Sequence, residues 1–394
     1  MIISIKLYRA EEKKMQKKIL VILLFVSLCF GTAWAGDTIK IGFNAPLTGF
    51  AASDGKSSTF GAKLAIKQIN EEGGINGKKL ELIIYDDQAK ASQSIPIANK
   101  MLWQDKVVVG ISGSYSGPTR SAAGVFQEAK VPYISAYAIH PDITKAGNFI
   151  FRTSFLGEVQ GRAGAKLIGD TLGKKRVVLI TLKNDFGKSL AAGFKEKAKD
   201  FGITIINEYE YSIKDRQFGA IVAKVKSDNP DAIYASGYFF TAGPLVSQLR
   251  ASGITVPVIG QEGYDSQKFI EIAGKAAEGV IITTSLDRDS KVPETANFIK
   301  NFESLAGYKA DMVAASANTA VRVAALAIEK AKSTDPEKIR AAIAGISLKT
   351  ATGTIEFNSL GEVLKDVQNQ VVKNGEWHHH SVISDHKLLA PPEK

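Results

Sequence analysis

The stretch IKIGFNAPLTGFAASDGKSSTFGAKLAIKQINEEGGINGKKLELIIYDD, residues 39–87, decides the fold. It opens on the β-branched run IKIGF and closes on a second apolar run, KLELIIYDD. Between these runs lie four apolar residues at the i, i+3, i+4, i+7 spacing of an amphipathic helix: Ala62, Ala65, Ile66 and Ile69. The helical pattern ends at a Gly-Gly pair, so the stretch predicts a strand, a helix and a second strand.

This alternation continues along the chain. VVVGIS, RVVLITL, AIYASGY, VPVIG and GVIITT have the composition of strands, with helical segments before or after each. Strands that alternate with helices predict mostly parallel sheets covered by helices on both faces. About ten such strands are too many for one compact sheet, so we expect an α/β protein of two Rossmann-like lobes, each with its ligand crevice at the carboxyl ends of the strands.

Two late strands, GTIEFN at 353–358 and DVQNQVVKNGEW at 366–377, follow the long helices of the C-terminal third. This return to strands predicts that the chain crosses between the lobes more than once.

The N-terminal segment has the pattern of a secretory signal peptide. Two lysines precede the apolar run ILVILLFVSLCF at 19–30, and the small-residue site AWA follows at 33–35. We predict cleavage after Ala35 and export of the protein, and we interpret residues 1–14 as a mis-called start. The alternative is a lipoprotein anchored through Cys29, which requires a small residue in place of Leu28.

Composition excludes several classes of function. After residue 35 the chain keeps 44 basic and 38 acidic residues, a net charge of +6, with no basic run interleaved with aromatic residues. We therefore expect no nucleic-acid partner. The only cysteine lies in the predicted signal peptide, so the exported protein must depend on its hydrophobic core rather than on disulfides.

The Ser/Gly-rich stretch GISGSYSGPTRSAAG, residues 110–124, is the first candidate site. It has no lysine for a Walker loop and lacks both the G-x-G-x-x-G spacing and the G-x-S-x-G elbow. After the signal peptide the histidines are His140 and four near the C-terminus, so a Ser-His-Asp triad would have to recruit His140. We expect no catalytic residues, and the chain is predicted not to be an enzyme.

An anion site remains possible in this stretch. Ser112, Ser114 and Ser116 follow a strand and precede a helix predicted over 118–129. Free N–H groups and the positive end of the helix dipole attract a carboxylate there, and hydroxyl groups add donors. The alternative is that one serine only caps its own helix.

Three further loops leave predicted strand ends, at 133–144, 235–243 and 260–265. Glu262, in the last of them, is either a solvated loop charge or the anchor of a cation. An anion site in one lobe and a cation anchor in the other would suit a zwitterion. The histidine-rich stretch HHHSVISDHK, residues 378–387, lies after the last predicted strand, and we expect a solvated tail there rather than a metal site.

Several motifs in order resemble the leucine/isoleucine/valine-binding family of ABC-transporter substrate-binding proteins. These are the opening stretch, GISGSYS, VPYISAYA, FIFRTSF, DFGKSLA, YASGYFF and GQEG, and the resemblance covers essentially all of the chain after the signal peptide. It implies a type I periplasmic binding protein, with two Rossmann-like lobes joined by a three-strand hinge. The implied lobes are 36–155 with 286–355, and 156–285 with 356–394.

The resemblance also implies roles for single residues. Ser114 matches the carboxylate-binding serine, Ala138 the backbone-binding alanine, Tyr238 the aromatic residue beside the ligand, and Glu262 the ammonium anchor. Three positions depart from the family pattern: Ile139 replaces a threonine, Asp54 an aromatic residue, and Phe186 a tyrosine. We include them among the candidate ligand-binding residues, because they alter the zwitterion clamp and the side-chain pocket.

The function implied is that of a periplasmic receptor. It would bind an amino acid, branched-chain or otherwise aliphatic, and deliver it to an inner-membrane ABC permease, as a monomer and without cofactor or metal. The alternatives are a receptor for a short amide, urea or aromatic acid on the same fold, and the sensor domain of a signalling system.

Overall fold

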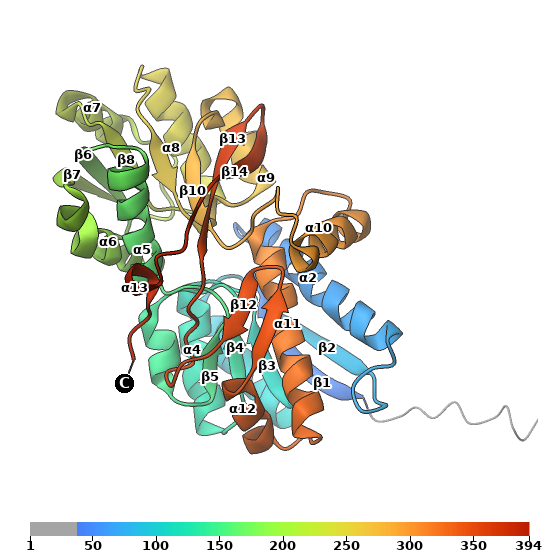
Figure 1. The fold of residues 1–394 in the computed structure, drawn as a ribbon. Helices are drawn as coiled ribbons and strands as arrows, with labels where there is room; N and C mark the ends of the chain where they lie inside the picture. Colours follow the sequence, from blue (N-terminus) through green and yellow to red (C-terminus); the bar gives the residue numbers. More distant parts are fainter. Residues whose placement is uncertain (1–37, 394) are drawn as a thin grey trace, which may run out of the picture. The chain divides into compact units, whose positions relative to one another are not determined.

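The structure is a computed structural model that describes residues 38–393, so the predicted signal peptide and Cys29 lie outside the described residues. Residues 39–394 form one unit by their contacts. Two large sheets, each with its own helices, make up this unit (Figure 1). The predicted strand–helix–strand unit at its start is confirmed, as Ile39–Ala45, Ala52–Glu71 and Leu80–Asp86.

The first sheet has five parallel strands in the order β2-β1-β3-β4-β5. Its strands are β1 (Ile39–Ala45), β2 (Leu80–Asp86), β3 (Val109–Ser112), β4 (Tyr133–Ser135) and β5 (Ile150–Arg152). The helices of this lobe are α2 (Ala52–Glu71), α3 (Ala91–Asn99), α4 (Ser116–Glu128), α10 (Pro293–Ala306), α11 (Met312–Ala331) and α12 (Pro336–Ala344), of which α10 packs against α2 and α12 against α11. A separate hairpin, β11 (Ser347–Thr350) with β12 (Gly353–Glu356), follows them.

The second sheet has seven strands in the order β14-β13-β10-β9-β8-β6-β7. Five of them are parallel: β6 (Arg176–Leu182), β7 (Thr204–Tyr211), β8 (Ala232–Ala235), β9 (Val258–Gly260) and β10 (Ile281–Thr284). The other two, β13 (Val367–Lys373) and β14 (Glu376–Ile383), are antiparallel. The helices of this part are α5 (Gly157–Lys166), α6 (Asp185–Ala198), α7 (Gly219–Asp228), α8 (Phe239–Ala251), α9 (Gln267–Ala273) and α13 (His386–Leu389).

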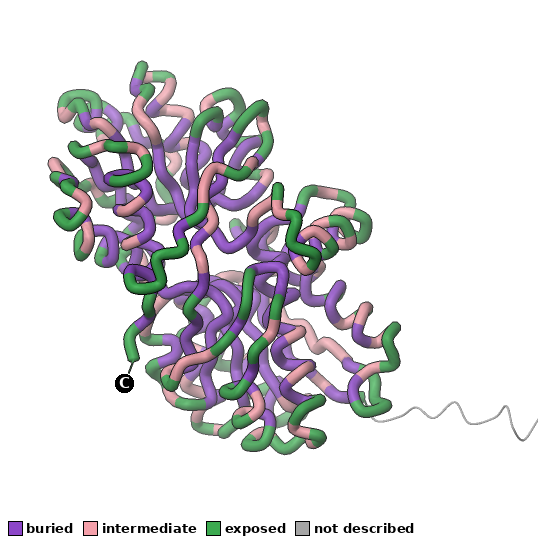
Figure 2. Tube along the Cα trace, viewed as in Figure 1, coloured by how far each residue is buried: buried purple, intermediate pink, exposed green. Residues whose placement is uncertain are grey.

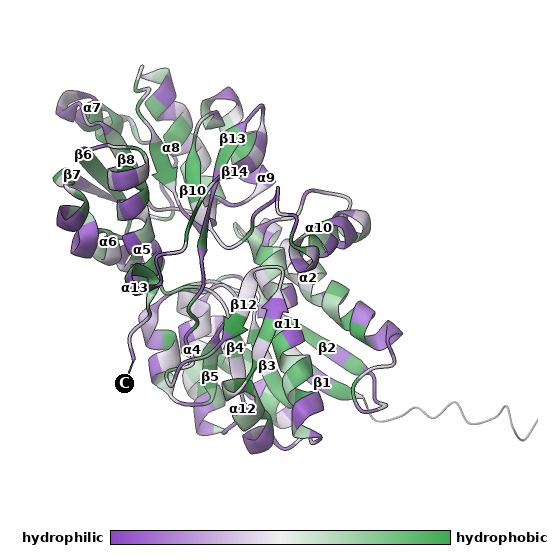
Figure 3. Ribbon diagram, in the orientation of Figure 1, coloured by the Kyte–Doolittle hydropathy of each residue, from purple (hydrophilic) through white to green (hydrophobic). Residues whose placement is uncertain are grey.

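Buried apolar side chains of the strands pack each sheet against its helices. Ile41 and Phe43 of β1 are fully buried, and the central strands of both sheets lie inside, whereas the edge strands β7 and β14, the loops and the outer helix faces are largely exposed (Figure 2). Apolar residues gather on the central strands (Figure 3). One helix in the described part, α11, is long and apolar enough to cross a membrane, but 83% of its apolar window is buried within the protein. It packs against α2, as a core helix does.

Three segments connect the two sheets: 153–156 after β5, 285–292 after β10, and 357–366 after β12. The chain therefore crosses between the lobes three times, as predicted. The strands of the first sheet fall in the range predicted for the first lobe, and β6 to β10, β13 and β14 in the range predicted for the second. The exact lobe boundaries stay a prediction.

The expectation of a solvated histidine tail was wrong. DVQNQVVKNGEW is not one strand, because Asn374 and Gly375 have positive φ angles of 54° and 77° and reverse the chain in a tight turn. Glu376–Ile383 then pairs with β13, so that His378 lies opposite Val371 and His379 opposite Gln370. The Asn-Gly pair in the sequence was the signal for this hairpin. Among the described residues, no group of three or more potential metal ligands occurs.

Candidate functional site

A small cavity lies where the carboxyl ends of strands from both sheets meet. Residues of both lobes line it: Asp54, Tyr115, Ser116, Tyr137, Ala138, Phe186, Tyr238, Glu262, Gly263, Met312 and Val313. Its free volume is about 20 Å³, room for roughly one water molecule. No lysine, arginine or histidine is among these residues. The position agrees with the crevice predicted for parallel α/β sheets.

The Ser/Gly-rich stretch supplies the start of α4 to this cavity. Ser116 is the first residue of the helix, and its buried Oγ has no hydrogen-bond partner in the described structure. The first N–H groups of a helix have no partner within it, and Pro118 contributes none. Tyr115 occupies the N-cap position without a side-chain cap, so the alternative of a capping serine was wrong. This helix start can accept an anion.

Ser114, the serine predicted to bind a carboxylate, does not line the cavity. It is fully buried near Asp87, a carboxyl whose pKa is raised by burial, and its Oγ, like that of Ser116, has no hydrogen-bond partner in the described structure. The serine at the cavity is Ser116, two residues further along. The ligand-binding role of Ser114 stays a prediction.

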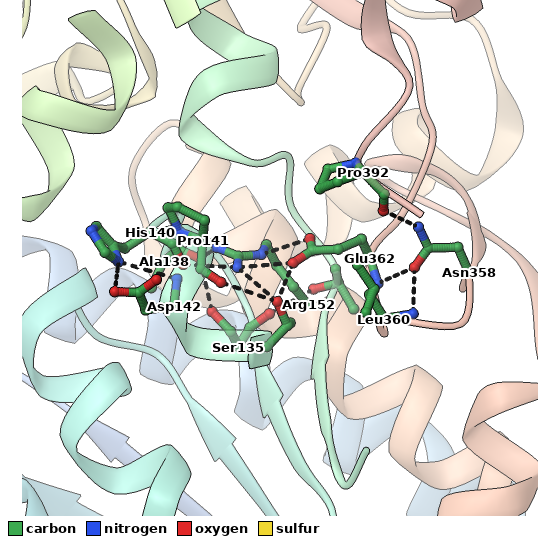
Figure 4. Close-up of polar contacts among 12 residues, drawn as sticks. Ser135, Ala138, His140, Pro141, Asp142, Arg152, Asn358, Leu360, Glu362 and Pro392 are labelled. Carbon is green, nitrogen blue, oxygen red and sulfur yellow. Dashed lines mark hydrogen bonds and ion pairs between the residues drawn. The ribbon is translucent and has the colours of Figure 1, made fainter. Parts of the chain in front are cut away.

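Ala138 lies at the cavity in the loop after β4, and its backbone is oriented by neighbouring groups. Its carbonyl accepts hydrogen bonds from Ser135 Oγ at 3.1 Å and from Arg152 Nη1 at 2.7 Å (Figure 4). Its N–H has no hydrogen bond among those of the described residues. The free backbone group of Ala138 at the cavity is therefore a donor.

Arg152 connects this loop to the third crossover. The fully buried guanidinium pairs with Glu362, with Nε–Oε2 at 2.9 Å and Nη2–Oε1 at 3.0 Å, and Nη2 also donates to His140 O at 2.9 Å (Figure 4). Because Arg152 ends β5, directly before the first hinge segment, and Glu362 belongs to the third, 357–366, the ion pair joins the end of β5 to the third hinge segment and to the loop of Ala138.

Glu262 follows β9 and is buried, with 4% of its surface exposed. Its Oε2 has no hydrogen-bond partner in the described structure. Burial raises its pKa to about 8, although the charge of Lys365 acts in the opposite direction. Lys365, in the third crossover, donates to Thr153 O at 3.2 Å, and burial lowers its pKa to about 7. Glu262 is thus a buried, unpaired acid of the second lobe and not a solvated loop charge.

Aromatic rings from both lobes meet across the cavity. The rings of Tyr115 and Tyr238 stack with centroids 4.2 Å apart and an interplanar angle of 9°, and Phe186 stacks on the other side of Tyr238 at 4.8 Å. The cavity of about 20 Å³ is too small for an amino acid, so a ligand of that size requires the stacked rings of Tyr115 and Tyr238 to separate. Tyr115 was not predicted, although it stands between two of the candidate serines.

Asp54 lies in the first turn of α2 and lines the cavity. Tyr115 donates its hydroxyl hydrogen bond to Asp54 Oδ2 at 2.7 Å. Burial raises the pKa of Asp54 to about 8, and the nearby carboxyls of Asp311 and Asp265 act in the same direction.

Close backbone approach builds the second-lobe wall. A Cβ on Gly263 would lie 2.1 Å from Gly237 O and 3.1 Å from the ring of Phe186. Any larger residue would push the loop that carries Glu262 away from the loop after β8.

The structure brings five of the seven predicted residues to the cavity: Asp54, Ala138, Phe186, Tyr238 and Glu262. Ile139 is fully buried outside the cavity lining, near Gly157. The sequence reasoning missed five residues of the lining: Tyr115, Tyr137, Gly263, Met312 and Val313. Tyr137 stood in a quoted loop, whereas the last two come from the start of α11, about 175 residues further along the chain, and had no local signal.

Comparisons with known proteins find similar sequences among periplasmic binding proteins. The sequence profile of the family described as periplasmic binding protein matches residues 38–367. The leucine-, isoleucine-, valine-, threonine- and alanine-binding protein of Pseudomonas aeruginosa is 32% identical over 347 residues, which cover 87% of this chain and 91% of that protein. The Leu/Ile/Val-binding protein BraC3 of Rhizobium johnstonii is 32% identical over 356 residues, 89% of this chain and 95% of the relative.

A solved structure is similar as well. The branched-chain amino acid transporter substrate binding protein LivJ of Streptococcus pneumoniae, in complex with isoleucine, has a TM-score of 0.83 and 28% identity, covering 88% of this chain and 99% of that one.

Proposed function

This chain belongs to the periplasmic binding protein family, and on that premise we propose that it binds an α-amino acid between its two lobes and delivers it to a membrane permease. The type I fold and the resemblance to leucine/isoleucine/valine-binding proteins are confirmed. The protein is a binding component in this proposal, without a catalytic step.

One observation carries the proposal: a buried, unpaired acid and an anion site face one cavity from opposite lobes. Glu262 presents Oε2 without a partner from the second lobe. Ser116 Oγ, the first N–H groups of α4 and the N–H of Ala138 are donors from the first lobe. An ammonium at Glu262 and a carboxylate at the start of α4 would complete both sets of hydrogen bonds.

Contacts between the lobes support closure around a ligand. Besides the stack of Tyr115 on Tyr238, Phe50 packs edge-on against Phe240 with centroids 5.1 Å apart. Arg120 Nη2 of α4 lies 3.1 Å from Asp185 Oδ2 of α6. A ligand that bridges the two lobes favours the closed form by its differential affinity for that form.

The names of the relatives guide the choice of ligand. They specify leucine, isoleucine, valine, threonine and alanine, all amino acids with short, largely aliphatic side chains. We propose a ligand of this class, a permease of the ABC type as partner, and a periplasmic location after cleavage behind Ala35. A monomer is the expected state.

A thermal-shift screen of the purified protein against the twenty amino acids, short amides and aromatic acids tests the proposal. A ligand at 100 times its dissociation constant stabilises the folded protein by about 2.7 kcal/mol, an easily measured rise in Tm. We expect such a rise with at least one α-amino acid and none with its N-acetyl derivative, which lacks the ammonium. No response to any α-amino acid would contradict the proposal.

A further inference from the structure

Resting on the proposed function, we propose that Asp54 is a second anchor for the ligand and selects amino acids whose short side chain carries a hydrogen-bond donor. The donor is a hydroxyl or an amine. The feature behind this inference is that two carboxyl groups, Asp54 and Glu262, line the cavity from opposite lobes, while no cationic side chain does.

Asp54 has an acceptor left over. It is 6% exposed, and its one hydrogen bond among the described residues is the one that Oδ2 accepts from Tyr115 at 2.7 Å. That bond fixes the carboxyl group at the cavity wall. The second oxygen, Oδ1, has no donor from the described protein and is available to a group in the cavity.

The backbone groups of an amino acid already have partners elsewhere in the cavity. The donors at the start of α4 and the N–H of Ala138 suit its carboxylate, and Glu262 suits its ammonium. Asp54 lies in the first turn of α2, a different element from those three. The remaining part of the ligand, its side chain, is therefore the group that meets Asp54.

An aliphatic side chain against Asp54 would bury the carboxyl group with one of its oxygens unpaired. Leaving a buried polar group unpaired is unfavourable, and sites built to bond a donor reject analogues that lack it. A hydroxyl or amine supplies the missing bond. The faces of Tyr115, which is hydrogen-bonded to Asp54, and of Tyr238 become free when the two rings separate, and they also favour an amine, because aromatic faces attract cations.

The test is titration calorimetry of the purified protein with two matched ligand pairs. L-threonine and L-valine differ by a hydroxyl in place of a methyl, and L-2,4-diaminobutyrate and L-norvaline by an ammonium in place of a methyl. We expect the donor-bearing member of each pair to bind at least about tenfold more tightly.

Two substitutions assign this preference to Asp54. Asp54→Ala should bring both ratios to about one. Asp54→Asn keeps an acceptor oxygen, so it should retain the preference for threonine and lose most of that for diaminobutyrate. Asp200→Asn, an exposed aspartate that pairs with Lys197 away from the cavity, is the control and should change neither ratio. Thermal melts confirm that each variant is folded.

The outcomes separate this inference from the proposed function. Equal binding of valine and threonine by the wild type would overturn the inference and leave the amino-acid receptor intact. Equal weakening of all four ligands by Asp54→Ala would also overturn it, because Asp54 would then share the α-ammonium with Glu262. Binding of none of the four ligands, nor of any amino acid in the thermal screen, would overturn both.

Discussion

Asp54 and Glu262 are the two buried carboxyl groups of the cavity, and burial raises the pKa of each to about 8. Without a ligand both therefore hold a proton in the folded protein at neutral pH. In the unfolded chain the same groups lose their protons near pH 4. Each carries a pH-dependent contribution to stability.

The sign of this contribution follows from proton binding. Between about pH 4 and 8 the folded state keeps the proton on Asp54, whereas the unfolded state releases it. The contribution of Asp54 to the free energy of unfolding is therefore fully present at about pH 4 and is lost as the pH rises to 8. The loss is about 1.4 kcal/mol per pH unit. Asp54→Asn lacks this dependence, so in thermal melts the Tm of the variant should rise relative to the Tm of the wild type as the pH increases from 5 to 8. A constant difference over that range would show that Asp54 keeps an ordinary pKa.

The two serines at α4 give a second prediction at this scale. Ser116→Ala should weaken amino-acid binding by about tenfold, because it removes a donor at the cavity. Ser114→Ala, which alters a buried site beside Asp87, should change affinity less than it changes Tm. Calorimetry measures the affinity of both variants and thermal melts measure their Tm. A larger loss of affinity in Ser114→Ala than in Ser116→Ala would show that Ser114, not Ser116, binds the carboxylate.

The hinge segments depend on one buried ion pair. Glu362→Ala would leave the guanidinium of Arg152 buried without its carboxylate, which costs about 3–5 kcal/mol. We expect a large fall in the free energy of unfolding by urea and, because Arg152 also holds the carbonyl of Ala138, weaker ligand binding in the variant that remains folded. Glu356→Ala, an exposed glutamate on β12, is the matched control. A loss below 1 kcal/mol would mean that Arg152 finds another partner.

At the level of elements, sequence reasoning succeeded where the pattern is local. The strand–helix–strand unit of residues 39–87 and the loops at strand ends followed from periodicity alone. The β13–β14 hairpin was missed although Asn374-Gly375 signals it, because the following histidines suggested a tail. The contribution of α11 to the cavity could not be predicted, because it depends on how distant segments pack.

At the scale of the whole molecule, one ion pair between the lobes, Arg120 with Asp185, can be tested by itself. Arg120 and Asp185 are partly exposed, and such pairs contribute about 0–1 kcal/mol. Asp185→Ala should therefore weaken ligand affinity by no more than about fivefold, with the effect falling at high salt. Calorimetry at low and high ionic strength checks this, and a hundredfold loss would show that the ion pair, rather than the ligand, holds the lobes closed.

The central claim is that Glu262 anchors the ammonium of an amino acid, and calorimetry of Glu262→Gln with the best amino acid of the screen tests it most directly. Glu271→Gln, an exposed glutamate of α9 that pairs with Lys268, serves as the control. Because the substitution leaves the ligand's buried ammonium without its counter-charge, we expect a loss of about 2–5 kcal/mol, roughly 30-fold or more in Kd, and wild-type affinity in the control. Unchanged affinity in Glu262→Gln would contradict the account.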